Sequence, residues 1–227
     1  MMSKQSLTIS LWALWFKRNK LVNEGLNFKM HELMGFIKNY AQDCCSNKNV
    51  VSFLTVPKII SWYPPTDRAT KLNFDASFLC NTNEAIVAVL ARDAEGQVMG
   101  ACTYPLREIA DAFIAEARTC ERALYFARDM GFSNIILEGD SLTIFKKVKS
   151  TNEDRSILRP ITKNIRFLER FFKNIEYRFV PREVNRAVYA LAVDGRRRDY
   201  PCCWVEEVPD PVAKLVELDR NTWLCHG

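Results

Sequence analysis

The stretch Lys71-Leu-Asn-Phe-Asp-Ala-Ser-Phe78 alternates between apolar and polar side chains. Its leucine, alanine and two phenylalanines fall on one face, and its asparagine, aspartate and serine fall on the other, which is the pattern of a half-buried β-strand. Asp75 lies in the middle of this strand, where an acidic side chain is costly unless a cation or another partner compensates it. The stretch therefore predicts the first strand of a sheet and a binding position on that strand.

Two further strands follow at short intervals. Residues 85–91 form a nearly continuous apolar run, which is typical of a buried strand. Asp93-Ala-Glu-Gly96 is a hairpin-turn sequence, and residues 97–104 are its partner strand. Three consecutive strands joined by short turns predict an antiparallel meander.

Helices and strands alternate after the meander. A long helix is predicted at 109–130, where Gly131 ends it. The same periodicities predict a strand at 134–138, helices at 140–148 and 156–172, a strand at 175–180 and a helix at 184–193. This order of elements predicts an α/β fold with a mixed five-stranded sheet and helices on both faces.

Consecutive prolines in Trp62-Tyr-Pro-Pro-Thr-Asp67 interrupt regular structure and predict a linker at 62–67. Residues 1–61 before it are expected to form a short helical N-terminal extension, with amphipathic helices at 7–22 and 31–45. The main domain is then expected at 68–199, and residues 200–227 are expected to be a C-terminal tail.

The composition is that of an ordinary globular chain. With 227 residues, of which 48% are hydrophobic and 26% charged, one domain with extensions is expected. The net charge of +5 permits nucleic-acid binding without demanding it. The apolar run at 7–16 is too short to cross a bilayer and has no cleavage site after it. We therefore expect no membrane association and an intracellular location, either nucleus or cytoplasm.

The eight cysteines form no C-x-x-C pair, which favours scattered thiols in a reducing compartment. A zinc site built from Cys202, Cys203, Cys225 and His226 is the alternative, although adjacent cysteines rarely bind one ion together.

Three carboxylates from separate predicted elements stand out. Glu116 has apolar neighbours one turn away along its helix, so it lies on the stripe that faces the sheet. Asp140 closes the strand at 134–138, and Asp75 lies within the first strand. Oxygen ligands suit Mg²⁺ or Mn²⁺, and two such ions can activate a water and stabilise the leaving oxygen of a phosphodiester. The three side chains therefore predict a divalent-metal site.

Each carboxylate also has an ordinary interpretation. Asp140 is placed to cap a helix, Glu116 to pair with Arg118, and Asp75 to accept hydrogen bonds from backbone amides. A metal site that uses all three carboxylates is favoured, because otherwise three separate explanations would all have to be true.

Residues 62–193 resemble the plant RNase H-like domain, a type-1 ribonuclease H relative found in plant non-LTR retroelement reverse transcriptases. The motifs that carry the resemblance are Lys71-Leu-Asn-Phe-Asp-Ala76, Leu90-Ala-Arg-Asp93 with Gly96, Ala115-Glu116, Leu137-Glu-Gly-Asp-Ser141, Val180-Pro-Arg-Glu-Val-Asn185 and Ala190-Leu-Ala192. The resemblance implies the ribonuclease H fold and metal-dependent hydrolysis of the RNA strand of RNA–DNA hybrids with two Mg²⁺ ions. It assigns metal ligation to Asp75, Glu116 and Asp140, with Asp75 bridging the ions.

The chain departs from the family pattern at two places. In Asn185-Arg-Ala-Val-Tyr-Ala-Leu-Ala192, Tyr189 holds the position of the fourth ligand, and a neutral phenol binds magnesium poorly. The glycines that open the second strand of the family are also absent from residues 83–88. These departures predict weakened hydrolysis. They leave open an inactive nucleic-acid-binding module or a retroelement remnant without function.

Basic residues flank the junction between the strand at 175–180 and the last predicted helix. Arg182, Asn185 and Arg186 are expected to contact nucleic acid there, because cationic and amide groups bind phosphates. The expected partner is an RNA–DNA hybrid or RNA, and no obligate protein partner is inferred. A solvated charged surface is the ordinary alternative.

Overall fold

The computed structural model describes residues 61–66, 68–149 and 157–226. The helices predicted at 7–22 and 31–45 lie outside these ranges. None of the helices described is both long and apolar enough to cross a membrane.

One mixed sheet of six strands organises the described residues, in the order β5-β4-β1-β2-β3-β6. Strands β1, β2 and β3 pair antiparallel, whereas β4 pairs parallel with both β1 and β5. The strands are β1 Thr70–Leu79, β2 Glu84–Arg92, β3 Val98–Leu106, β4 Asn134–Gly139, β5 Asn174–Phe179 and β6 Cys202–Val205. The predicted meander and mixed sheet are confirmed.

The predicted number of five strands is wrong, because β6 pairs antiparallel with β3 at the edge of the sheet. This strand has only four residues, and its side chains alternate between half-buried and exposed. Its residues Cys202-Cys-Trp-Val205 are all apolar, but a run of four is too short to distinguish an edge strand from a tail.

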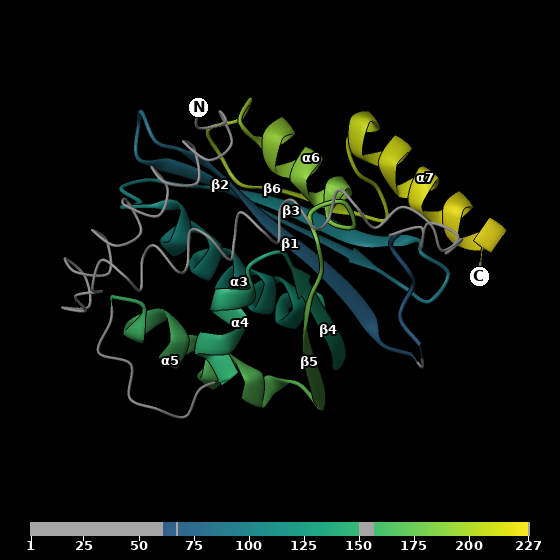
Figure 1. The fold of residues 1–227 in the computed structure, drawn as a ribbon, viewed down its shortest axis with the longest axis horizontal. Coiled ribbons are helices and arrows are strands. Elements are labelled where there is room, and N and C mark those ends of the chain that lie inside the picture. The colour runs from purple at the N-terminus through teal and green to yellow at the C-terminus, as the bar shows by residue number, and fades with distance from the viewer. Residues whose placement is uncertain (1–60, 67, 150–156, 227) are drawn as a thin grey trace, which may run out of the picture. The chain divides into compact units, whose positions relative to one another are not determined.

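Five α-helices cover the two faces of the sheet in the described part of the chain. Figure 1 shows α3, α4 and α5 on one side and α6 and α7 on the other, as predicted for a sheet covered on both faces. The helices are α3 Ala112–Asp129, α4 Leu142–Lys149, α5 Arg159–Leu168 with the 3₁₀ turn η1 Glu169–Phe171, α6 Arg186–Gly195 and α7 Asp210–His226.

The ends of α3 follow from its sequence. The Asp111 side chain accepts a hydrogen bond from the Ile114 amide at 2.8 Å and so caps the first turn. Gly131 beyond the other end has a φ of 76°, a conformation that glycine adopts without strain. These two residues set the limits of the helix that carries Glu116.

Helix α7 was not predicted from the sequence, yet it belongs to the core. Val212 and Val216 of α7 are buried together with Leu191 of α6 and Leu90 of β2. The prolines around its start look like a helix stop, although proline is well tolerated in a first helical turn. Residues 202–226 therefore add a strand and a helix to the domain.

The proline-rich stretch also contributes to the core. Trp62 is fully buried and packs with Val180 and Val184. The segment predicted as a linker therefore contacts the domain through its tryptophan.

Candidate metal centre

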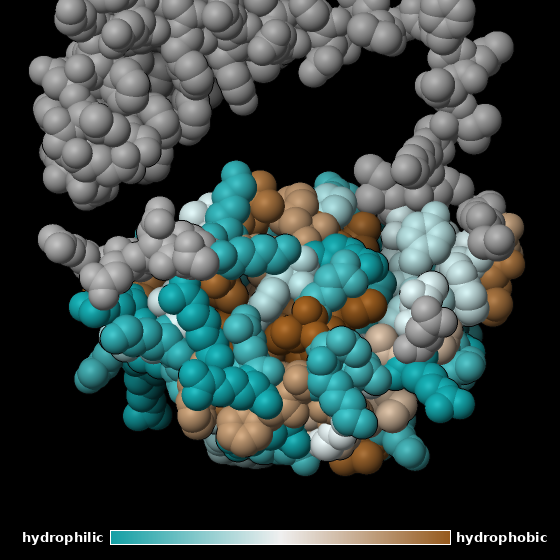
Figure 2. All heavy atoms as spheres, turned by 90° about the horizontal axis from the view of Figure 1, so that it is seen from below, coloured by the Kyte–Doolittle hydropathy of each residue, from teal (hydrophilic) through white to brown (hydrophobic). Residues whose placement is uncertain are grey.

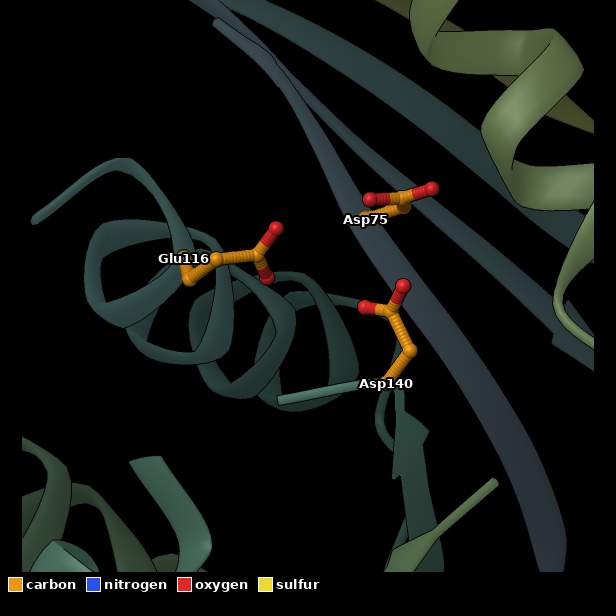
Figure 3. A group of neighbouring side chains, drawn as sticks. All are labelled: Asp75, Glu116 and Asp140. Atoms are coloured by element: carbon orange, nitrogen blue, oxygen red, sulfur yellow. The ribbon is translucent and has the colours of Figure 1, made fainter. Parts of the chain in front are cut away.

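Asp75, Glu116 and Asp140 meet at one point of the fold. Each offers a carboxylate oxygen, and these three oxygens lie within 4.8 Å of one another. Figure 3 shows the three side chains converging from β1, α3 and the end of β4. The strand register explains part of this arrangement: Asn73 pairs with Glu138, so the residues two positions further on, Asp75 and Asp140, lie level on neighbouring parallel strands.

The ordinary interpretations of Asp75 and Glu116 leave oxygens unaccounted for. Asp75 is 3% exposed, and its Oδ1 accepts a hydrogen bond from the Ala76 amide at 2.8 Å. Within the described residues, Asp75 Oδ2 and Glu116 Oε2 are buried without a hydrogen-bond partner. Arg118 donates instead to Glu121, at 2.9 Å. Buried carboxylate oxygens without partners are costly, and a bound cation would compensate them.

The electrostatics of the site also favour a cation. Burial raises the pKa of Asp75 to about 7, and the negative charge of Asp140 adds to this rise. Burial raises the pKa of Glu116 to about 8, with further contributions from the charges of Asp75 and Asp140. The positive charge of Arg182 acts in the opposite direction on both pKa values. Three hard oxygen donors with mutual repulsion fit Mg²⁺ or Mn²⁺.

Metal affinity is expected to rise with pH between about 6 and 8. In the metal-free protein the raised pKa values of Asp75 and Glu116 keep their carboxyls largely protonated below about pH 7, so protons compete with the ion. For the same reason the unfolding free energy of the metal-free protein should fall as pH rises from about 4 to about 8, because the raised folded-state pKa values oppose ionisation.

Calorimetric Mn²⁺ titrations at several pH values measure the first effect, and metal-free chemical denaturation measures the second. A metal affinity that is constant across this pH range would contradict the raised pKa values.

The position of the fourth ligand holds no acid. Tyr189 lies on α6, and the guanidinium carbon of Arg182 lies 4.5 Å from the centroid of its ring. Asp194, further along α6, pairs with Arg198 at 2.6 Å and with Arg197 at 3.7 Å. Among the described residues, the candidate metal centre therefore consists of three carboxylates without a fourth acid. The positive charge of Arg182 acts on two of them, Asp75 and Glu116.

The residues predicted to contact nucleic acid fall into two environments. Arg182 and Arg186 are exposed, and Arg186 lies 3.9 Å from Asp219. Asn185 is 1% exposed, donates to the Phe74 carbonyl at 2.9 Å and accepts from Asn73 at 3.2 Å. These hydrogen bonds attach the start of α6 to β1, and the buried Asn185 side chain does not extend toward a ligand.

A buried polar network lies next to the carboxylates and went unpredicted. Asn73, two residues before Asp75, donates to Glu138, which lies two residues before Asp140, at 3.1 Å. Glu138 in turn forms an ion pair of 2.8 Å with the buried Lys71. The network therefore ties β1 to β4 just before each strand reaches the site.

Arg92 extends this network to the C-terminal helix. Its fully buried guanidinium donates to Asn73 at 2.9 Å and to Asp219 of α7 at 2.9 Å. The ring of Trp62 lies 3.6 Å from the guanidinium carbon, and its indole also donates to Asn73. The network was not predicted, although Arg92 ends an apolar strand and a charge at such a place is a sequence signal for a buried partner.

Cys202, Cys203 and Cys225 are free thiols, and Cys203 and Cys225 are exposed. The side chain of His226 lies outside the described residues, so the zinc alternative stays a prediction.

Residues 73–195, just over half of the chain, match the family described as reverse transcriptase-like. The comparison with curated proteins finds no match. Among solved structures, the RNase H1 of the halophilic archaeon Halobacterium salinarum is 25% identical with a TM-score of 0.53, covering 57% of this chain and 98% of its own.

Two further structures are similar at lower identity. The N-terminal RNase H domain of a Mycobacterium tuberculosis protein is 20% identical with a TM-score of 0.52, covering 58% of this chain and 95% of its own. LC11-RNase H1, solved in complex with an RNA/DNA hybrid, is 18% identical with a TM-score of 0.50, covering 57% of this chain and 99% of its own. These likenesses show an RNase H-like α/β fold.

Proposed function

Because the chain belongs to the reverse transcriptase-like family, we propose that it is an RNase H-type endoribonuclease that hydrolyses the RNA strand of RNA–DNA hybrids. One observation carries the proposal: three carboxylates from β1, α3 and the end of β4 converge with two buried oxygens that lack partners. The hybrid bound to the similar LC11-RNase H1 supports the choice of substrate. The motifs shared with plant retroelement domains support an origin of the same kind.

The three carboxylates would hold Mg²⁺ or Mn²⁺, in the two-ion arrangement that the resemblance implies. When bound, such ions supply an activated water and stabilise the leaving oxygen of the phosphodiester. Asp75 is central to this role because it is the most buried of the three, and Asp140 and Glu116 face it. The exposed Arg182, whose charge already acts on Asp75 and Glu116, is placed to attract the scissile phosphate.

The second candidate is a module that binds hybrid without hydrolysing it. Tyr189 favours this interpretation, because its ring contacts Arg182 at the position where a fourth acidic ligand is expected. A neutral phenol adds no charge to compensate a second divalent ion.

We propose that the functional domain runs from Trp62 to the end of α7, since Trp62 and α7 both contribute to its core. Residues 1–61 would then form the extension before it.

A cleavage assay tests the proposal and separates the two candidates. Purified full-length protein with Mg²⁺ or Mn²⁺ is expected to shorten the labelled RNA strand of a hybrid, and Asp75→Asn is expected to abolish the product. Tyr189→Asp should increase cleavage by completing the ligand set, whereas Tyr189→Phe should leave it unchanged. Binding of hybrid with no cleavage by wild type or by Tyr189→Asp would favour the binding module, and product that persists in Asp75→Asn would refute the assigned site.

A further inference from the structure

Arginine and aromatic side chains lie in a row across the surface formed by α3, α5 and η1. Arg122 and Arg128 flank the ring of Tyr125, with guanidinium carbons 5.8 and 5.1 Å from its centroid. Arg128 also lies 5.7 Å from the ring of Phe171. We call the six residues of this row the arginine–aromatic ladder; they are Arg122, Tyr125, Arg128, Phe171, Phe167 and Arg170.

The two phenylalanines of the ladder are held in place but are not buried. Their rings contact edge to face at 5.6 Å, and each residue is 52% exposed. Arg170 lies 6.0 Å from the ring of Phe167. Figure 2, which views the molecule from the α5 side, shows apolar patches surrounded by hydrophilic side chains on this face. Exposed aromatic rings in contact with arginines present stacking surfaces beside positive charge.

The Tyr125 side chain is held in place by a hydrogen bond from α5. Its hydroxyl accepts a hydrogen bond from Asn164 of α5 at 2.8 Å, and Asn164 also donates to Glu121. The ring between Arg122 and Arg128 is therefore held before any ligand arrives, which lowers the ordering cost of binding.

The charge around the ladder is positive. Glu121 pairs with Arg118 at 2.9 Å, and Asp129 pairs with Arg128 of the ladder itself at 2.8 Å. Glu169 accepts from the neutral Tyr177 hydroxyl at 2.7 Å and keeps its negative charge, so the surplus of positive charge comes from Arg122, Arg170 and the lysines around them. Further exposed cations follow on and around α4 and α5, namely Lys146, Lys149, Lys163 and Lys173. A polyanion complements this surface better than a protein segment of mixed charge does.

We propose that the arginine–aromatic ladder binds single-stranded nucleic acid, with bases stacked on Phe167 and Phe171 and phosphates on the arginines. This combination of stacking rings and cations is how proteins hold single strands without sequence preference. The inference rests on the proposed function for the source of the strand. Arg128 lies twelve residues beyond Glu116 on α3, about 18 Å along the helix and about 120° around it, so a single-stranded continuation of the hybrid would pass around α3 to the ladder. A hollow of 440 Å³, whose lining includes Arg118, Arg122, Glu108 and Glu121, adjoins the Arg122 end of the ladder and has room for an unstacked base.

Fluorescence anisotropy with a short labelled oligouridine tests the ladder, using the full chain in EDTA so that no hydrolysis occurs. Phe167→Ala/Phe171→Ala is expected to weaken binding at least about tenfold, since stacking contributes roughly 1–3 kcal/mol per base. Leu218→Ala/Leu224→Ala removes two exposed apolar side chains of α7 and should leave binding unchanged. Arg128→Gln/Arg170→Gln keeps the rings and should lower the salt dependence, by about 0.7 in logarithmic slope for each phosphate that the variant no longer neutralises.

Wild-type affinity in both ladder variants would overturn the inference, as would equal losses in the α7 control. Self-association of the wild type that disappears in Phe167→Ala/Phe171→Ala would also overturn it, because the face would then bind a second copy. Failure of the proposed hydrolysis is a separate outcome: wild-type protein that cleaves no hybrid should still bind oligouridine in EDTA, where no metal takes part. Ladder variants that bind oligouridine more weakly but still cleave a blunt hybrid would support the ladder and leave the proposed function intact.

Discussion

Replacing Asp219 by alanine is expected to lower the unfolding free energy by about 3–5 kcal/mol. Asp219 accepts from Arg92 at 2.9 Å, and both side chains are buried between α7 and the sheet. The substitution would leave the fully buried guanidinium of Arg92 without its carboxylate, and an uncompensated buried charge is among the most destabilising changes known. Because Arg92 also bonds Asn73 beside the site, metal affinity should fall together with stability.

Chemical denaturation of three variants checks this prediction. Asp219→Ala should show the large loss, and Glu217→Ala, an exposed carboxylate on the same helix, should stay within about 0.5 kcal/mol of wild type. The double variant Arg92→Met/Asp219→Leu should recover much of the loss, since well-packed apolar pairs often replace buried ion pairs at little cost. Equal effects of Asp219→Ala and Glu217→Ala would show that α7 is not attached through this ion pair.

Asp75→Asn is expected to abolish the stabilisation of the protein by divalent metal. In the wild type, Mn²⁺ at a hundred times its Kd should raise the unfolding free energy by about 2.7 kcal/mol, because the ion binds only the folded state. The variant should lose this gain, since Asp75 faces the other two carboxylates. Without metal, the variant should be more stable than the wild type above about pH 7, because the amide carries no buried charge and repels neither Glu116 nor Asp140.

Thermal denaturation with and without Mn²⁺ at pH 8 measures both effects in one experiment: the loss of stabilisation by the metal and the gain in stability without it. Glu183→Gln serves as the matched control, because this carboxylate is exposed in the loop that carries Arg182. It should respond to Mn²⁺ as the wild type does. A metal-induced rise in melting temperature that survives in Asp75→Asn would place the ion elsewhere.

The site carboxylates were identified from the sequence because local periodicity reports which face a side chain occupies. Alternation over Lys71–Phe78 placed Asp75 on β1, and helical spacing placed Glu116 on the inward stripe of α3. The strand that ends at Gly139 brings Asp140 to the same edge. These are properties of a few neighbouring residues, so no knowledge of distant contacts was needed.

The network around Asn73 depended on contacts that no local pattern shows. Arg92 and Asp219 are 127 residues apart in the chain, and Asn73 and Asn185 are 112 apart. Asn185 sits in a motif that suggested a ligand contact, but packing of α6 on β1 buries it. A polar side chain has the same local sequence whether it points to solvent or to a partner from another element.

The sequence alone determined the order of the main elements and the three residues that carry the acidic site, because periods of two and 3.6 residues dictate which side chains share a face. Only the tertiary structure decided that β6 and α7 complete the domain, that Trp62 belongs to its core, and that Arg92 links α7 to β1. The same holds for the arginine–aromatic ladder, whose members come from α3, α5 and η1. Such features arise when separate elements pack, and their free energy lies in contacts between residues far apart in the chain.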